Sequence, residues 1–283
     1  MTVPTGVTLE FIGLGRMGGA MAGHLLAAGH RVAGVDPSPD ARDVARDIGV
    51  EIVALEELRG PVVLSSLPGD AEVEVVYLGG LLERLEPGSL CLDLSTIDVT
   101  LSQRIALAAA DRGHRFLDCP VSGTSVHARA GTLAVMVGGD AEAVERARPY
   151  LSAFSSSIHH VGSNGSGLEM KLITNRLLNA HLIAIAEGIL EMEEAGLDPA
   201  ACIELLRQGA VPRLLDYKAG PMAARDHAPL FTVDLMAKDL GLADNRRTAG
   251  AVGESAAAIL RRAQSQGWGP SDISAVIEVL GQD

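Results

Sequence analysis

The stretch FIGLGRMGGAMAGHL, residues 11–25, decides the fold because it contains glycines at the spacing Gly13-x-Gly15-x-x-Gly18. Glycines spaced in this way let a strand turn tightly beneath a pyrophosphate and lead into a helix whose N-terminus faces the phosphates. The same glycines could instead form a packing seam. An apolar run directly before them and a helical pattern over residues 17–28 favour the turn. The stretch therefore predicts a strand–turn–helix unit that binds a dinucleotide.

An acidic residue follows at the distance that such a unit requires. The next apolar run, HRVAGVD, ends at Asp36, eighteen residues after Gly18. A carboxylate there can accept hydrogen bonds from ribose hydroxyls and would repel a 2′-phosphate. Residues 37–41 contain no Arg or Lys to hold such a phosphate, so we predict NAD rather than NADP as the cofactor. The predicted contacts are Gly13, Leu14, Gly15, Arg16, Met17, Gly18 and Asp36.

The first half of the chain alternates between strand and helix patterns. Short continuous apolar runs end in turn residues at 7–12, 32–35, 62–64, 90–92 and 116–117. Helical spacing separates most of them, at 17–28, 40–48, 71–78 and 100–112. Two later runs, at 133–137 and 158–161, flank a helical pattern that starts near Asp140. Continuous rather than alternating apolar strands indicate a doubly wound, mostly parallel sheet that is covered on both faces.

The second half of the chain has a different sequence pattern. The segment GSNGSG, residues 162–167, predicts a flexible or tight connection, and a helical pattern without proline then runs from Leu168 to about Ala195. The segments after Gly196 also have helical patterns, separated by prolines. We therefore predict an α/β Rossmann domain over residues 1–162 and an all-helical domain over residues 163–283, joined by a long helix.

The overall composition excludes several classes of protein. The net charge of −13 leaves no basic surface for a nucleic-acid backbone. No apolar run is long enough to predict a membrane span, and the N-terminal residues lack a signal-peptide pattern. The histidines show no metal-ligand spacing, so no metal is predicted. Three sparse cysteines predict reduced thiols and a cytoplasmic protein.

Three further segments rich in Ser, Thr, Gly and Pro follow predicted strands. They are SSLPG at 65–69, LDLSTI at 92–97 and DCPVSGTSVHARAGTL at 118–133. Each segment taken singly could equally be an ordinary turn. All three, however, lie at the carboxyl ends of strands, where open α/β sheets bind their ligands. We therefore predict that these segments line a ligand site.

The segment GLEMKLITNRLLN, residues 167–179, places three polar side chains on one face of the predicted long helix. Lys171, Asn175 and Asn179 are spaced by four residues and lie among apolar neighbours. A lysine on a helix is most often simply solvated. A lysine and two asparagines in one strip beside a glycine-rich junction could instead face a cleft. A partly desolvated ammonium there would give up its proton readily, as an acid/base catalyst must.

Four segments resemble, in the same order, the signature regions of the β-hydroxyacid dehydrogenase family, which includes 3-hydroxyisobutyrate dehydrogenase and several semialdehyde reductases. They are residues 11–25, 118–133, 165–175 and 236–243. The resemblance covers essentially the whole chain. It implies hydride transfer between NAD and a short 3-hydroxy acid or its semialdehyde, a helical domain that completes the cleft, and a homodimer or homotetramer.

The resemblance also implies roles for residues that contact the substrate. Lys171 would be the catalytic acid/base, and Asn175 would help to hold the substrate. Ser122 and Gly123 would bind the substrate carboxylate through a hydroxyl and a backbone N–H group. Phe231 would form part of the pocket wall. The expected substrate is a small molecule that bears a carboxylate.

On the cofactor side, the resemblance implies contacts from Thr96 and Lys238, and the segment 65–69 at the end of its strand predicts two more. Thr96 would lie near the nicotinamide ribose, and Leu67 and Pro68 would line the same site. Lys238 would contact the cofactor side of the cleft, with Asp239 fixing the helix around it.

The chain departs from the family pattern at two positions. Thr124 stands where members usually have a second glycine after Ser-Gly, and His127 stands where they have a small residue. Thr124 would lie beside the carboxylate site, and His127 is either a surface loop residue or a contact that alters the accepted substrate. Cys119 next to this loop has no base near it in the sequence and is predicted to be a buried thiol rather than a nucleophile.

Three alternative functions remain open. An imine reductase of the same superfamily usually lacks the lysine and prefers NADPH, so Lys171 and Asp36 argue against it. A catalytically silent dinucleotide-binding module would have no need of Lys171 together with Asn175. A decarboxylating enzyme such as 6-phosphogluconate dehydrogenase would need more basic residues for a phosphate than this acidic chain offers.

Overall fold

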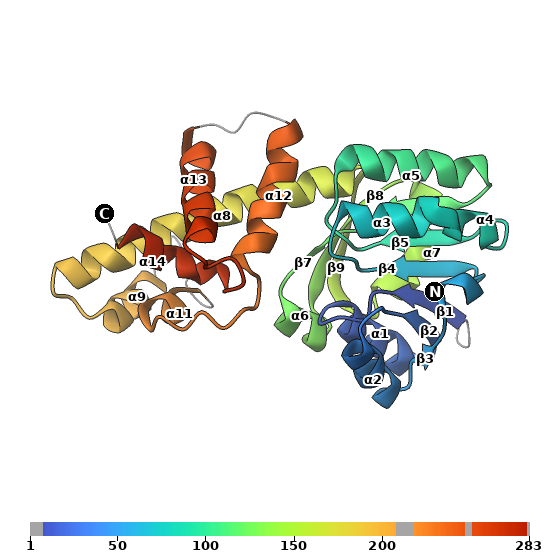
Figure 1. Ribbon diagram of the computed structural model, residues 1–283, viewed down its shortest axis with the longest axis horizontal. Helices are drawn as coiled ribbons and strands as arrows, with labels where there is room; N and C mark the ends of the chain where they lie inside the picture. Colours follow the sequence, from blue (N-terminus) through green and yellow to red (C-terminus); the bar gives the residue numbers. More distant parts are fainter. Residues whose placement is uncertain (1–7, 208–217, 247–250, 282–283) are drawn as a thin grey trace. The chain divides into compact units, whose positions relative to one another are not determined.

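Figure 1 shows a computed structural model of the chain, which describes residues 8–207, 218–246 and 251–281. The chain divides into two compact units that meet between Lys171 and Leu172. Each unit has a hydrophobic core of its own. The predicted domain boundary near residue 162 lies at the end of the last strand, a few residues before this division.

The first unit is built on one sheet, in which nine strands are found among the described residues. They are β1 (Thr8–Ile12), β2 (Arg31–Val35), β3 (Glu51–Ile52), β4 (Val62–Ser65), β5 (Leu90–Asp93), β6 (Arg115–Asp118), β7 (Val121–Ser122), β8 (Leu133–Gly138) and β9 (Ser155–Gly162). The strand order is β3-β2-β1-β4-β5-β6-β8-β7, and β9 pairs with β8. The six strands from β3 to β6 are parallel, in the order of a Rossmann fold. The mostly parallel sheet is therefore confirmed, since only the pairs β6–β8 and β7–β8 are antiparallel.

Helices cover both faces of this sheet. They are α1 (Gly18–Ala27), α2 (Pro39–Asp47), α3 (Asp70–Val76), α4 (Leu82–Arg84), α5 (Val99–Asp111), α6 (Ser125–Ala130) and α7 (Ala141–Leu151), with a 3₁₀ turn η1 (Leu55–Glu57) and a π-helical turn η2 (Tyr77–Leu81). In Figure 1, α1 and α2 lie on one face, and α3 and α5 lie on the other. Crossover helices on both faces explain why the parallel strands are continuous apolar runs.

Local sequence signals set where several helices begin. Ser38 is the N-cap of α2 and is followed by Pro39 in the first turn. Asp98 accepts the N–H groups of Thr100 and Leu101 at the start of α5, and Asp140 accepts the N–H of Ala143 at the start of α7. Short polar side chains at these positions satisfy backbone donors that the helix itself leaves without partners.

The long helix predicted from Leu168 to about Ala195 is confirmed as α8 (Ser166–Glu194). The connection before it is tight rather than flexible, because Ser166 N–H donates to the Ser163 carbonyl at 2.9 Å and Gly165 has φ +94°. Only glycine adopts such a backbone conformation readily.

The second unit is helical over its described residues, as predicted. After α8 it contains α9 (Pro199–Arg207), α11 (Gly220–Ala223), α12 (Val233–Arg246), α13 (Ala251–Ser265), the 3₁₀ turn η4 (Ile273–Ala275) and α14 (Val276–Leu280). Its core is formed by apolar side chains from α8, α12, α13 and α14, among them Leu182, Met236, Leu260 and Ile277. Figure 1 shows α12 and α13 as neighbours beside α8.

Candidate active site

Each of the three glycines in the turn after β1 has a different structural role. Gly13 has φ +91°, and a Cβ there would lie 2.3 Å from the Ser66 carbonyl oxygen. A Cβ on Gly18 would lie 1.8 Å from the Gly13 oxygen, so α1 can start close to the turn only without one. At Gly15, by contrast, a Cβ would meet no atom of the described residues within 4 Å. The backbone at Gly15 is therefore open to a ligand, as a pyrophosphate requires.

Asp36 at the end of β2 is tied to this turn. Its Oδ2 accepts the N–H of Leu14 at 2.7 Å, and its Oδ1 accepts the N–H of Ser38 at 2.8 Å. Arg42 donates from Nη1 to the backbone oxygens of Asp36 and Pro37, both at 2.9 Å. The segment 37–41, which contains no Arg or Lys, ends one residue before Arg42. The structure thus brings a positive charge to the acidic end of β2.

The turns after β4 and β5 are joined through a buried carboxylate. Asp93 Oδ1 accepts the hydroxyl protons of Ser65 at 2.8 Å and Ser95 at 2.6 Å. Because Ser95 donates to Asp93, its oxygen is available to accept the N–H of Leu67, at 2.9 Å. Tyr77 OH lies 2.8 Å from the Ser65 oxygen. Asp93 thereby holds Leu67, a predicted cofactor contact, in place through Ser95.

The burial of Asp93 has a cost in free energy. Burial raises its pKa to about 6, and the Ser95 and Ser65 hydrogen bonds counter only part of this effect. Asp118, its register partner on β6, adds like-charge repulsion that raises the pKa of Asp93 further. The Oδ2 atom of Asp93 has no hydrogen-bond partner among the described residues.

We expect Asp93→Asn to become more stable relative to the wild type as the pH rises. The folded-state pKa lies above the unfolded value, so ionisation of Asp93 destabilises the fold progressively between about pH 4 and pH 6. The shift corresponds to about 3 kcal/mol, which the uncharged amide does not incur. Urea unfolding of both proteins from pH 4 to pH 8 measures this difference, and a pH-independent difference would contradict the assignment.

The segment 118–133 contains more structure than the predicted turn. Ser122 lies in β7, and Thr124 is the N-cap of the short helix α6. His127 Nδ1 accepts the N–H of Thr124 at 3.1 Å, which closes a capping box. A Cβ on Gly123, which has φ +132°, would lie 2.9 Å from His127 Cβ. His127 thus has a local role that fixes the loop after Ser122.

Lys171, Asn175 and Asn179 are buried on one face of α8, with 8%, 2% and 1% exposure. Of their apolar neighbours, Leu168 and Leu172 are buried, whereas Met170, Ile173 and Leu177 lie on the exposed side of the helix. The lysine is therefore not an ordinary solvated surface residue.

Within the helical unit, Asn175 is held by α12. Its Nδ2 donates to Asp239 Oδ2 at 2.6 Å, and Asp239 is itself buried. Lys238 Nζ lies 2.9 Å from Asp239 Oδ1 and is partly exposed. The structure thus brings together two residues predicted for opposite sides of the site, Asn175 and Lys238, through one carboxylate.

Phe231 packs against the core of the helical unit. Its N–H donates to Asp272 Oδ2 at 3.1 Å, as does that of Leu230 at 3.0 Å. Asp272 in turn forms a buried ion pair with Lys218 at 2.6 Å. Neither sequence pattern nor spacing pointed to this pair, which fixes the backbone that bears Phe231.

The cofactor contacts predicted near the turns therefore cluster in the first unit. Gly13 abuts Ser66 and the side chain of Leu67, and Leu14 is bonded to Asp36. Arg16, Met17, Pro68 and Thr96 lie on the same turns or directly beside them. Asn175, Phe231 and Lys238 belong to the helical unit instead.

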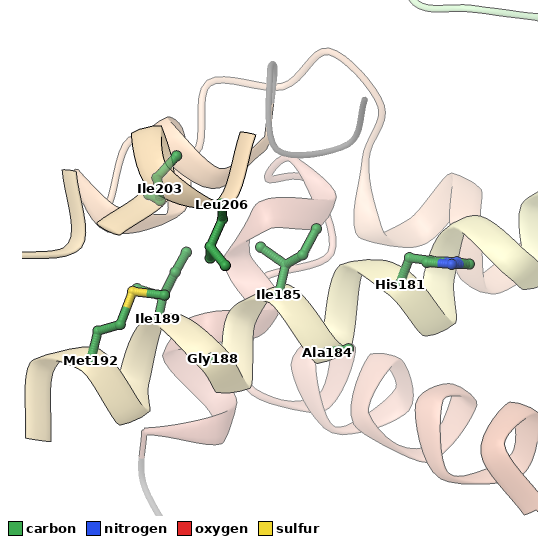
Figure 2. Close-up of a pocket in the computed structure, with 8 residues that line it drawn as sticks. All are labelled: His181, Ala184, Ile185, Gly188, Ile189, Met192, Ile203 and Leu206. Atoms are coloured by element: carbon green, nitrogen blue, oxygen red, sulfur yellow. The ribbon is translucent and has the colours of Figure 1, made fainter. Parts of the chain in front are cut away.

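Other features of the described residues bear on the site. Cys119 is buried, and burial raises its pKa well above the usual thiol range, as predicted for an inert thiol. The described residues contain no cluster of three metal-ligating side chains and no helix that could span a membrane. An apolar pocket of about 160 Å³ between α8 and α9 (Figure 2) includes none of the predicted site residues.

Comparison with known proteins agrees with this geometry. Residues 8–162 match a family model described as the NAD binding domain of 6-phosphogluconate dehydrogenase. Residues 165–280 match one described as NAD-binding of NADP-dependent 3-hydroxyisobutyrate dehydrogenase.

Individual relatives are similar over most of their length. An NAD-dependent L-serine dehydrogenase of Pseudomonas aeruginosa is 39% identical, over 95% of this chain and 96% of the relative. A 3-hydroxyisobutyrate dehydrogenase of the same species is 41% identical over 83% of each chain. The solved structure of Mycobacterium tuberculosis 3-hydroxyisobutyrate dehydrogenase with L-serine has a TM-score of 0.87 at 34% identity, and covers 98% of this chain and 99% of its own.

A glycine turn that is open at Gly15 and hydrogen-bonded to the carboxylate of Asp36 is the arrangement of a dinucleotide-binding turn. Together with the matches over both units, it shows that the chain belongs to the β-hydroxyacid dehydrogenase family.

Proposed function

We propose that this protein is an NAD-dependent dehydrogenase of short 3-hydroxy acids that uses Lys171 as its general acid/base. One observation above all supports the proposal: a lysine with 8% exposure sits on the same helix face as a buried, hydrogen-bonded Asn175. A silent dinucleotide-binding module gains nothing from burying an amine, because desolvation of that group costs free energy.

The proposed roles divide between substrate and cofactor. Ser122 and the backbone of Gly123 bind the substrate carboxylate, and Asn175, oriented by Asp239, holds the remainder of the substrate. Lys171 takes the proton of the substrate hydroxyl in oxidation and returns it in reduction. When bound, the nicotinamide supplies the hydride chemistry, and the protein supplies placement and proton exchange.

The proposed substrates are suggested by the relatives. L-serine and 3-hydroxyisobutyrate, which appear in their names, are both carboxylates with a hydroxyl on the third carbon. A carboxylate anchor at a fixed distance from a proton acceptor selects this chemical class by length. Thr124 and His127 stiffen the loop beside the proposed carboxylate site, so they are the proposed determinants of which acid is preferred.

The test is a cofactor-reduction assay on the purified protein. NAD or NADP would be supplied with 3-hydroxyisobutyrate, L-serine, 3-hydroxypropionate and glycerate, with 4-hydroxybutyrate as a control of the wrong length. Turnover of one of the four acids but not of the control supports the proposal. Cofactor binding without turnover of any acid or semialdehyde would favour a silent module. Turnover of imines would favour an imine reductase, a solved example of which, from a Pseudomonas species, shares only the fold at 18% identity.

The preference for NAD rests on Asp36. We expect Asp36→Ser to lower the ratio of kcat/KM for NAD over NADP by about tenfold or more, since a hydrogen bond to a charged group contributes roughly 1.5–3 kcal/mol. Removal of the carboxylate also leaves Arg42 as the charge beside the ribose. Steady-state kinetics with both cofactors measure the ratio.

Two further variants sharpen this test. Asp43→Ser removes an exposed carboxylate of α2 that pairs with Arg46, and should leave the ratio unchanged. In the double variant with Arg42→Ala, any gain for NADP should be lost. An unchanged ratio in Asp36→Ser itself would contradict the proposed contact.

The proposed assembly is a homodimer or homotetramer. Ile173 and Leu177 are half exposed on the side of α8 opposite Lys171, and such apolar strips on a single chain are typical of contacts between copies. Light scattering on the purified protein measures the mass directly.

The three cysteines form no disulfide, which supports the proposed location in a reducing compartment, the cytoplasm.

A further inference from the structure

A carboxylate from the sheet caps the helix that bears the proposed catalytic lysine. Asp118, the last residue of β6, accepts the N–H of Gly165 on Oδ1 at 2.7 Å and the N–H of Leu168 on Oδ2 at 3.0 Å. Both donors lie at the start of α8, where a helix leaves its first backbone N–H groups without partners of its own. Helices are usually capped by a residue next to them in sequence, whereas this one is capped from 47 residues away.

The two hydrogen bonds favour the ionised side chain. Each oxygen of Asp118 accepts from a different backbone donor, so a proton on either oxygen would oppose one of them. Asp118 is fully buried, and burial raises its pKa, but the N–H groups of Gly165, Leu168 and Gly167 counter that effect. The positive end of the helix dipole also favours a negative charge at this point.

Two glycines make room for the carboxylate. A Cβ on Gly138 would lie 2.5 Å from Asp118 Oδ1. A Cβ on Gly167 would lie 2.8 Å from Asp118 Oδ2 and 2.7 Å from the Met136 carbonyl oxygen. The helix start can therefore sit directly on the strand end only because both side chains are absent.

We propose that Asp118 is a positioning residue, which sets the place of the Lys171 amine by fixing the first turn of α8 to the sheet. Lys171 lies three residues after Leu168, on the next turn of the same helix. The segment that leads to Ser122 starts directly after Asp118. Asp118 thus joins the helix that bears the proposed proton acceptor to the strand end from which the segment of Ser122 begins. The inference rests on the proposed role of Lys171.

Asp118→Asn is the direct test, with Asp140→Asn as its matched control. The amide retains one acceptor oxygen and turns an NH₂ group toward the other backbone donor. We expect kcat with L-serine or 3-hydroxyisobutyrate to fall at least about tenfold, because misplacement of a catalytic group by about 1 Å has effects of this size or larger. The Kd for NADH, followed by its fluorescence, should stay within about twofold, because Asp118 bonds the start of α8 and none of the proposed cofactor contacts. Asp140 caps α7 in the same unit, so Asp140→Asn should leave both quantities unchanged.

A second pair of variants separates positioning from general damage to the fold. Gly167→Ala pushes α8 away from Asp118 without altering any charge, and should lower kcat in the same way. Gly188→Ala is in the same helix, where a Cβ meets no atom of the described residues within 4 Å, and should have no effect on kcat. If kcat stays within twofold of the wild type in both Asp118→Asn and Gly167→Ala, the proposal is overturned.

Hydrogen exchange distinguishes this proposal from the proposed function. Amides at residues 165–168 should exchange faster in Asp118→Asn than in the wild type, whatever the substrate is. A wild-type protein that turns over none of the four acids of the cofactor-reduction assay, and no semialdehyde, would overturn the proposed function and the catalytic part of this inference. Faster exchange at residues 165–168 would still show that Asp118 fixes the start of α8. Unchanged exchange there would contradict that structural role.

Discussion

Replacement of Lys171 by alanine is expected to lower kcat by about 10²–10⁴-fold, the usual contribution of a positioned general acid/base. The buried amine is the group proposed to take the hydroxyl proton, and the adjacent amide of Asn175 cannot take one at neutral pH. The Kd for NADH should change little, since the glycine turn and Asp36 belong to other elements. Steady-state kinetics and fluorescence titration measure the two quantities.

Two observations would separate proton transfer from a packing effect. Lys171→Arg retains the positive charge and most of the length, but a guanidinium does not release its proton, so its kcat should fall as well. Small primary amines added to Lys171→Ala should restore part of the activity. A kcat in Lys171→Ala within threefold of the wild type would show that the acid/base is another group.

Asp272→Ala is expected to lower the free energy of unfolding of the helical unit by about 3–5 kcal/mol, the cost of leaving a buried charge without its partner. Lys218 has 2% exposure, and burial lowers its pKa despite the attraction of Asp272. Burial alone would raise the pKa of Asp272, but Lys218 and backbone N–H groups outweigh it and lower that pKa. Thermal and urea unfolding measure the loss.

The stabilisation from the carboxylate of Asp272 is present above its unfolded pKa and is lost as the pH falls below it, because the folded-state pKa is lowered. Lys218→Met should cost less than Asp272→Ala, since Asp272 retains the N–H groups of Leu230, Phe231 and Ser274 as donors. Glu204→Ala breaks an exposed pair with Arg207 and should have an effect below about 1 kcal/mol. Equal losses in all three variants would contradict the role of the buried pair.

Most of the fold was predictable because the buried strands of a parallel sheet and the helices between them each have a recognisable local sequence pattern. Continuous apolar runs marked β1, β2, β4, β5 and β6, and the uninterrupted helical pattern marked α8. The strand β3 was missed because it has two residues and exists only through its pairing with β2. The helix α6 was missed because its capping box uses His127 where Glu or Gln is usual.

The predictable part of the candidate site was the part with a fixed spacing. Glycines and a carboxylate at set intervals identified the dinucleotide turn, and a four-residue repeat identified the polar face of α8. Asp93 and Asp118 have no such pattern, because Asp93 accepts from Ser65, 28 residues away, and Asp118 from donors 47 and 50 residues away, which only the folded chain brings near. Arg42 was missed because it lies one residue beyond the segment 37–41 and reaches the carbonyl of Asp36, six residues earlier, only once α2 has formed.

The division of the chain after Lys171 has a consequence for how relatives can diversify. The proposed proton acceptor Lys171, the proposed positioning residue Asp118 and the glycine turn all belong to the first unit, whereas Asn175 and Phe231, which are proposed to contact the substrate, belong to the second. Under the proposed roles, mutations in the helical unit can change residues that contact the substrate while the proposed proton acceptor and the glycine turn are unchanged. Relatives with this arrangement can therefore change the acid that they accept without a change in the proposed proton acceptor.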